Sequence, residues 1–244
     1  HFLFGAENAD LLFDIFMHVA TLAAVFLFYR REIKNAVRAV FRARIPGTSW
    51  LAYRNWRDHD GRGLLLQLLI ATLVTGIIGI ACKDYFESLF SSPRAVGIAL
   101  CINAGILWLS RCAKPHLEPR LLPGVFGAVA LGLAQSVAIT PGISRSGATI
   151  VMALILGMEK GAAVRFSFFL AIPAILGALL LQLDESVTSS FSFMQVSVGF
   201  ASALVTGLAA LLLLVYIARV GKLHYFAPYT LSLGLLTVIW SLFL

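Results

Sequence analysis

The chain has 244 residues, of which 59% are hydrophobic and 13% charged, and its formal net charge is +7. A soluble domain carries about 25% charged residues, so this composition excludes an ordinary soluble protein and indicates an integral membrane protein. The positive charge does not indicate nucleic-acid binding, because the basic residues cluster in loops between apolar segments.

The apolar segments predict an all-α polytopic membrane protein with six transmembrane helices and one re-entrant helix-loop-helix, residues 121–158, in a single membrane domain. Each span is near the ~20 residues that a bilayer core requires. The first arm of the re-entrant pair is Leu121–Ile139. The second arm, Ala148–Met158, is too short to cross the membrane alone. The spans are predicted at 11–28, 64–80, 95–109, 163–181, 196–217 and 226–244.

Three spans precede the re-entrant pair and three follow it. When a repeat contains an odd number of spans, its second copy crosses the membrane in the opposite direction to the first. A matching re-entrant element ahead of the first span would therefore make the fold an inverted repeat, with its site at the membrane midplane.

The first span carries two ionisable residues, Asp14 and His18, on one helical face. This pair could orient a water molecule, hold a metal with other ligands, or hydrogen-bond to a neighbouring helix. The simpler alternative is mutual pairing at the mouth of the helix bundle.

The loop at residues 30–62 holds nine Lys and Arg residues, which predicts that it is cytoplasmic. Basic residues after the third and fifth spans predict that the C-terminal ends of these spans are also on the cytoplasmic side. Within the loop, Glu32–Arg44 has apolar residues at helical spacing, which favours an amphipathic helix on the inner leaflet over an ordinary solvated helix.

A polar loop, Pro141–Thr149, interrupts the apolar re-entrant segment. An arginine at membrane depth costs about 2.5–3.5 kcal/mol on insertion scales and is rarely there without a partner. Arg145 offers a planar fork that suits a phosphate, and Ser144, Ser146 and Thr149 offer hydroxyls. The alternative is a helix break with Arg145 paired to a structural carboxylate.

The loop is expected to end one helix at Pro141 and to begin the next near Ser146–Ala148, where free N–H groups favour an anion. Gly142 and Gly147 permit tight turns and close approach of a ligand. One of the serines could attack phosphorus, but only with a nearby base.

Three polar or helix-bending residues near the loop complete the prediction. Gln135 could hydrogen-bond to the loop, line its cavity, or join two helices. Pro173 is expected to kink the fourth span. Arg165 is expected to reach the cytoplasmic interface.

The sequence Pro-Gly-Ile-Ser-Arg-Ser-Gly-Ala-Thr at 141–149 resembles the second signature of the bacterial undecaprenyl-diphosphate phosphatases, the bacitracin-resistance family. The stretch from Phe13 to Val25 with Tyr29–Glu32 resembles the family's first complete span and its basic exit. The stretch from Phe166 to Ala178 resembles the helix after the signature.

The resemblance implies hydrolysis of undecaprenyl diphosphate to the monophosphate and phosphate, aided by a divalent cation such as Mg or Ca, in the bacterial plasma membrane. It implies recycling of the lipid carrier for peptidoglycan synthesis, and bacitracin resistance. The expected partners are a polyprenyl diphosphate lipid and the membrane, with a homodimer left open. Catalysis is assigned to Arg145, Ser144, Ser146 and Thr149, and substrate binding to Gly142, Gly147, Gln135, Asp14 and His18.

The family's first signature, a Glu-rich stretch ending in Ser-Ser-Thr-Gly-His, is absent from this sequence. Its metal-binding acidic residues are expected ahead of His1, so we expect the chain as written to be inactive alone. On physical grounds a transporter or flippase of a phosphorylated lipid or anion is the rival function. A structural membrane protein whose loop merely packs is a weaker rival.

Overall fold

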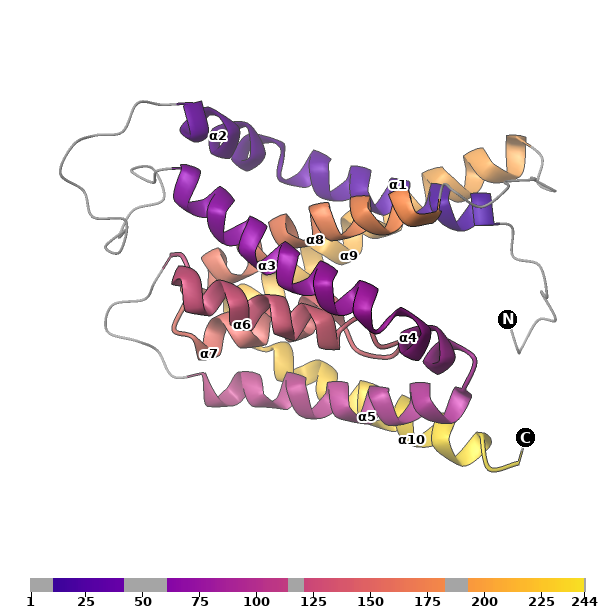
Figure 1. Ribbon diagram of the computed structural model, residues 1–244. Helices are drawn as coiled ribbons and strands as arrows, with labels where there is room; N and C mark the ends of the chain where they lie inside the picture. The colour runs from indigo at the N-terminus through magenta and orange to yellow at the C-terminus, as the bar shows by residue number, and fades with distance from the viewer. Residues whose placement is uncertain (1–10, 42–60, 114–120, 183–192, 244) are drawn as a thin grey trace. The chain divides into compact units, whose positions relative to one another are not determined.

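The computed structural model describes residues 11–41, 61–113, 121–182 and 193–243. These residues form α-helices and two short 3₁₀ helices, and no strand is found among them. Figure 1 shows the helices in chain order. Their bounds are α1 Leu11–Phe28, α2 Arg30–Phe41, α3 Gly61–Ala81, α4 Lys83–Phe90, α5 Pro93–Leu109, η1 Ser110–Cys112, α6 Gly124–Val137, α7 Arg145–Ile155, α8 Lys160–Gln182, α9 Phe193–Val220, η2 Leu223–Phe226 and α10 Ala227–Trp240.

The all-α polytopic architecture is as predicted. Four helical stretches are long and apolar enough to cross a membrane: 63–81, 93–112, 160–177 and 196–220. The other two predicted spans correspond to α1, with 18 residues, and α10, with 14. The total of six spans therefore stays a prediction.

One helix was not expected. The segment between the second and third spans forms α4, in which Lys83 and Glu87 pair at 3.5 Å. The segment predicted as an amphipathic helix, Glu32–Arg44, overlaps the helix α2, Arg30–Phe41, and its residues 42–44 lie outside the described residues. The helix α8 contains Pro173 in its interior and continues past it to Gln182.

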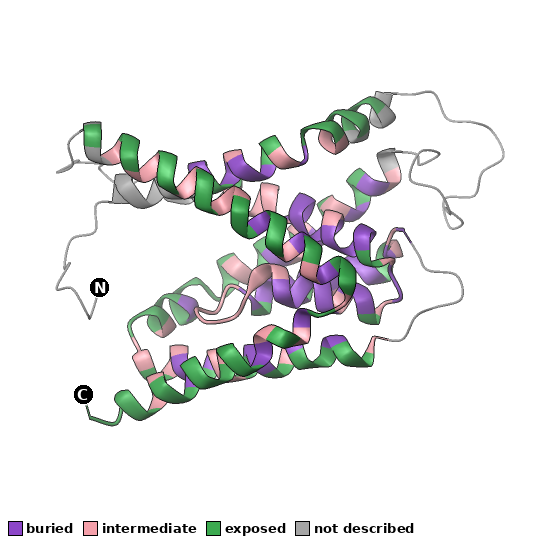
Figure 2. Ribbon diagram, turned by 180° about the vertical axis from the view of Figure 1, so that it is seen from behind, coloured by how far each residue is buried: buried purple, intermediate pink, exposed green. Residues whose placement is uncertain are grey.

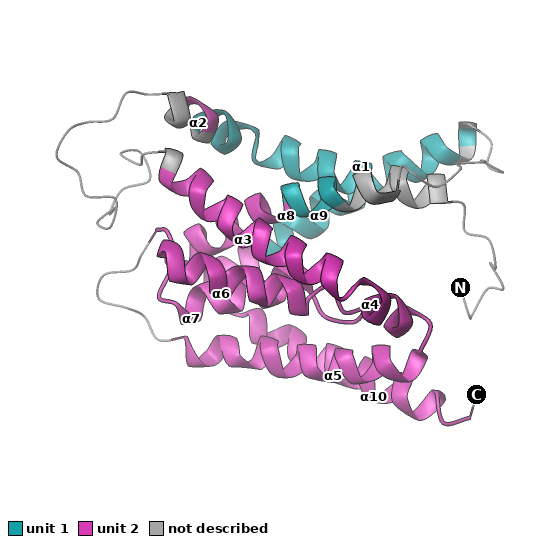
Figure 3. Cartoon of the chain, in the orientation of Figure 1, with its two compact units in different colours: residues 1–35, 172–214 teal, residues 36–171, 215–244 magenta. Residues whose placement is uncertain are grey.

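Two compact units make up the chain, and Figure 3 colours them separately. The first comprises residues 1–35 and 172–214, and the second comprises 36–171 and 215–244. In the first unit, Gly207 on α9 lies against the buried Ala24 of α1, since a Cβ at Gly207 would meet the Ala24 methyl at 3.5 Å. The prediction of a single membrane domain stays a prediction.

Close helix contacts in the second unit depend on glycine. A Cβ added to Gly234 of α10 would lie 2.8 Å from the carbonyl oxygen of Gly97 on α5. A Cβ added to Gly132 of α6 would lie 2.7 Å from the carbonyl oxygen of Ala71 on α3. Small residues at these crossings let the backbones approach, which is how helices associate in lipid.

The re-entrant pair lies at the centre of the second unit. The helices α6 and α7 contact each other and have 14 and 11 residues. At 1.5 Å per residue they are about 21 and 16 Å long, shorter than a hydrocarbon core of about 30 Å. Figure 2 shows buried residues gathered in α6, α7 and the start of α8. The loop between α6 and α7 is half-buried in this unit, and its position at membrane depth stays a prediction.

Helix ends that carry basic residues lie together at one end of the second unit. The η1 turn after α5 contacts η2, which follows α9, and it also contacts α7. At this end, the backbone N–H of Gly124 at the start of α6 donates to Oε1 of Gln67 on α3. Arg111 and Lys222 lie in or beside these turns. The charge pattern predicts that this end is cytoplasmic, and the orientation stays a prediction.

Candidate oxyanion site

The polar loop leaves α6 earlier than predicted. The helix ends at Val137, four residues before Pro141, and short turns follow, with the Ile143 N–H donating to the Thr140 carbonyl at 3.2 Å. Gly142 has φ of +100°, and a Cβ there would lie 2.8 Å from the Val96 carbonyl oxygen of α5. Glycine is required for both reasons, and the loop is held tightly against α5.

Ser144 begins the second half-helix. Its backbone is extended, its Oγ accepts a hydrogen bond from the Gly147 N–H at 3.1 Å, and α7 starts at Arg145. The predicted start at Ser146–Ala148 was therefore too late, because Ser144 is an N-cap of the kind that stabilises a helix start. A Cβ on Gly147 would lie 3.0 Å from both Ser144 Oγ and a Leu107 methyl, so Gly147 also serves packing.

The Ser144 cap leaves hydrogen-bond donors without acceptors at the N-terminus of α7. Among the described residues, no acceptor is found for the backbone N–H groups of Arg145 and Ser146. The Arg145 guanidinium likewise has no hydrogen bond or ion pair within this part of the chain. No structural carboxylate among these residues therefore pairs with Arg145, and its positive charge adds to the helix dipole.

The two serine hydroxyls lie beside these donors. Ser144 Oγ and Ser146 Oγ are 3.5 Å apart, and both residues are partly exposed. Because Ser144 Oγ accepts from Gly147, its own proton remains available to an oxyanion. The two N–H groups and the two hydroxyls lie together at the start of α7, and Arg145 is the first residue of that helix. We call this set of groups the cradle, and its binding of a tetrahedral anion stays a prediction.

Thr149 lies beneath the cradle rather than in it. The residue is fully buried, and its Oγ1 donates to the Arg145 carbonyl at 2.8 Å and lies 2.5 Å from Ser167 Oγ on α8. This geometry holds α7 against α8. A direct contact between Thr149 and substrate stays a prediction.

Gln135 is directed to α3 and not to the loop. It is 1% exposed, and its Nε2 donates to Thr75 Oγ1 at 3.3 Å. Thr75 Oγ1 in turn donates to carbonyls on both α3 and α6, those of Ala71 and Gly132. Of the alternatives weighed for Gln135, the structure shows helix–helix bonding.

Asp14 and His18 lie on α1, but their side chains are outside the part of the chain that the structure describes. Their assignment to substrate binding stays a prediction. No group of three His, Cys, Asp or Glu residues that could hold a metal ion is found among the described residues. The divalent cation that the resemblance implies stays a prediction.

Two residues of the site were missed by sequence reasoning. Asn103 on α5 is 2% exposed, and its Oδ1 accepts the backbone N–H of Ser144 at 3.0 Å. Ser167 on α8, 3% exposed, meets Thr149. A lone amide in an apolar span was the available signal for Asn103, since a polar group in lipid is rarely left without a hydrogen-bond partner.

We compared the amino-acid sequence of the chain with models of known protein families. A family model described as Bacitracin resistance protein BacA matches residues 1–236. The chain belongs to this family. The resemblance drawn from Pro141–Thr149 is thereby confirmed.

Members of the bacitracin resistance family that are similar to this chain carry the name undecaprenyl-diphosphatase. The protein of Desulfatibacillum aliphaticivorans is 40% identical over 238 residues, which are 95% of this chain and 85% of the relative. That of Desulforapulum autotrophicum is 37% identical, covering 97% of this chain and 86% of the relative. That of Alkaliphilus metalliredigens is 33% identical, covering 99% and 88%.

Proposed function

We propose that this membrane protein hydrolyses undecaprenyl diphosphate to undecaprenyl phosphate and inorganic phosphate. The observation that carries the proposal is the set of unpaired donors at Arg145 and Ser146, next to two serine hydroxyls. The names of the relatives supply the substrate. In a bacterial plasma membrane this reaction recycles the lipid carrier for peptidoglycan synthesis and gives bacitracin resistance.

The chain's own residues bind and neutralise the diphosphate. The Arg145 fork contacts two phosphoryl oxygens, while the N–H groups of Arg145 and Ser146 hold a third. Phosphoryl transfer depends on positioning and on stabilising the charge of the transition state, and this cradle does both. The loop is fixed for this task by Asn103 through Ser144 and by Ser167 through Thr149.

A divalent cation, Mg or Ca, is part of the proposal on family resemblance. It would neutralise charge on the diphosphate. No group of three His, Cys, Asp or Glu residues that could hold it is found among the described residues, and the binding roles proposed for Arg145, Ser144 and Ser146 are argued without it.

A homodimer is also included in the proposal. Val198, Val205 and Leu212 on α9 are apolar and exposed, and a second copy, in competition with lipid, would cover them. Cysteine crosslinking at Val205 in native membranes would give a dimer band, and a persistently monomeric product would remove the homodimer from the proposal.

The rival function is transport of a phosphorylated lipid, because broken helices also bind anions in transporters. Detergent micelles separate the two functions, since they have no second compartment. Hydrolysis releases inorganic phosphate from undecaprenyl diphosphate in micelles, and transport does not.

Two proteins are assayed in micelles for phosphate release: the chain beginning at His1, and a fusion that carries the Glu-rich signature segment of a relative ahead of His1. We expect release by the fusion. If the fusion binds the lipid and moves it across vesicles without releasing phosphate, the hydrolase proposal fails and the transporter takes its place.

A further inference from the structure

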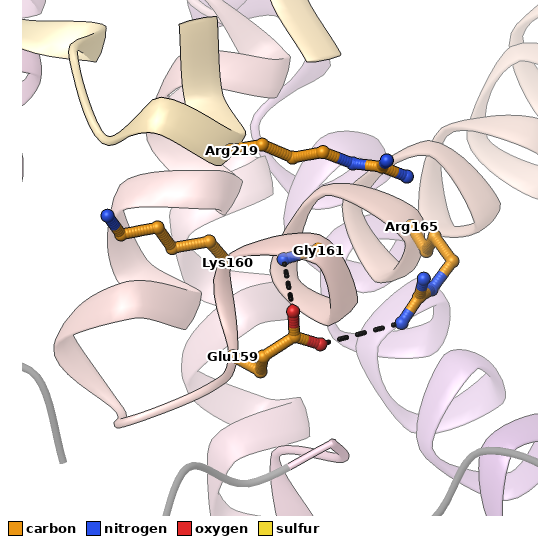
Figure 4. A pocket seen from close by; sticks show the side chains of 5 residues that line it. All are labelled: Glu159, Lys160, Gly161, Arg165 and Arg219. Carbon is orange, nitrogen blue, oxygen red and sulfur yellow. Dashed lines mark hydrogen bonds and ion pairs between the residues drawn. The ribbon is translucent and has the colours of Figure 1, made fainter. Parts of the chain in front are cut away.

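A second basic site lies at the far end of α7 from Arg145. A pocket of about 360 Å³ is lined by Glu159, Lys160, Gly161, Arg165 and Arg219, and Figure 4 shows it. All of these residues belong to the second compact unit. They come from the turn after α7, the first turns of α8 and the last turn of α9.

The pocket has an excess of positive charge. Arg165 Nη2 lies 3.6 Å from Glu159 Oε2, and the other carboxylate oxygen accepts the Gly161 N–H at 3.2 Å. The single carboxylate therefore offsets one of the three cations that line the pocket, and two positive charges remain.

The remaining cations differ in how they are held. Lys160 Nζ donates to the Val220 carbonyl at 3.3 Å, at the C-terminus of α9. In Figure 4 its ammonium points away from Glu159, while the Arg219 side chain extends across the pocket. No hydrogen bond or ion pair of Arg219 is found within the described ranges of the chain. Arg219 is therefore the cation most open to a ligand.

The pocket is separate from the cradle at Ser144–Ser146. The 11 residues of α7 lie between Arg145 and the turn that holds Glu159, a distance of about 16 Å along the helix. Arg219 also precedes the turn at Gly221, at the end of the protein that its charge pattern predicts to be cytoplasmic. A ligand in the pocket would approach from the inner leaflet.

We propose that this pocket binds the phosphate group of an anionic phospholipid from the inner leaflet. Guanidinium forks match phosphate oxygens, and basic pockets between transmembrane helices at the cytoplasmic side bind anionic headgroups. On α9 the neighbouring Tyr216 and Val220 are 67% and 44% exposed, so an apolar, lipid-facing surface adjoins the pocket. That surface favours a lipid over free inorganic phosphate, which shares the same headgroup chemistry.

The test measures lipid binding and does not depend on hydrolysis. The protein is placed in nanodiscs of phosphatidylcholine with increasing phosphatidylglycerol, and bound phosphatidylglycerol is counted by native mass spectrometry. Arg219→Gln is expected to weaken binding about fivefold, since one basic residue near the membrane surface is worth about that factor. Glu159→Gln is expected to strengthen it by a similar factor, because the amide oxygen still accepts the Gly161 N–H while the negative charge is lost.

Arg111→Gln is the matched control. Arg111 lies at the same end of the protein, 4.8 Å above the Trp108 ring, and outside the pocket. Its replacement should leave the affinity unchanged, whereas a loss equal to that of Arg219→Gln would reduce the effect to general surface charge and overturn the proposal. The gain from Glu159→Gln cannot arise from misfolding.

A separate arm distinguishes the source of the phosphate. Inorganic phosphate is titrated in nanodiscs that contain phosphatidylcholine alone, and thermal unfolding is recorded. The proposal expects no stabilisation that depends on Arg219. Phosphate stabilisation that Arg219→Gln abolishes, together with unchanged phosphatidylglycerol binding in that variant, would make the site one for free phosphate.

Discussion

The carboxamide of Asn103 on α5 accepts the backbone N–H of Ser144 at 3.0 Å, and this bond fixes the residue that caps α7. The backbone position of Arg145, the first residue of α7, follows from that cap, because Arg145 is the next residue. A single buried amide in an apolar helix thus positions the start of α7, where the cradle lies.

Replacing Asn103 by Leu removes the acceptor at nearly constant volume. The Ser144 N–H then loses its partner at a half-buried position, which costs at most about 1–3 kcal/mol. We expect phosphate release by the signature-bearing fusion to fall about tenfold or more as the cradle shifts. Asn103→Asp keeps the acceptor but adds a negative charge near the diphosphate, so its KM should rise more than its kcat falls. Equal kinetics for both variants would remove the positioning role.

The bond between Thr149 and Ser167 is expected to couple α7 to α8. Thr149→Val and Ser167→Ala each remove one hydroxyl from the 2.5 Å contact. A double-mutant cycle on the free energy of unfolding in detergent should give a coupling of about 0.5–1.5 kcal/mol. Purely additive losses would show that the two hydroxyls act independently.

Gly142→Ala tests the close approach of the loop to α5. The alanine meets both a φ of +100° and the Val96 carbonyl at 2.8 Å, so the loop must move. We expect a loss of about 1–3 kcal/mol in the free energy of unfolding, and weaker diphosphate binding.

Gly105→Ala on α5 is the control for this substitution. A Cβ there meets nothing within 4 Å, and alanine is the better helix former. The unfolding free energy should stay the same or rise slightly. Matched losses at Gly105 and Gly142 would contradict the role of the loop contact.

The positions of the long apolar helices were predictable from the sequence, because each of these helices coincides with a long apolar run. The first span was expected at residues 11–28, and α1 occupies Leu11–Phe28. The helix α4 was missed because its eight residues, Lys83–Phe90, are mixed in polarity. In short segments of mixed polarity, the secondary structure is decided by tertiary contacts with neighbouring elements. These contacts cannot be read from a single sequence.

The candidate site was predictable as a motif but not as an arrangement. Arg145, Ser144 and Ser146 lie together at the start of α7 because they are adjacent in the sequence. The contacts made by Asn103 and Ser167 span 41 and 18 residues, and they arise from the packing of α5 and α8 on the loop. Gln135 lies near the motif in sequence, yet the twist of α6 turns it to Thr75 on α3.

The most direct measurement of the central claim is the affinity of the cradle for a diphosphate that cannot be cleaved. A polyprenyl methylenediphosphonate is titrated into the detergent-solubilised protein, so that the result does not depend on turnover. Arg145→Ala should weaken binding about 100-fold, a loss near the upper range for a charge-assisted hydrogen bond. Arg145→Lys should recover only part of it, because a point charge replaces a fork. Arg94→Gln, an exposed cation at the start of α5, should bind as the parent protein does. Unchanged affinity in Arg145→Ala would contradict the account.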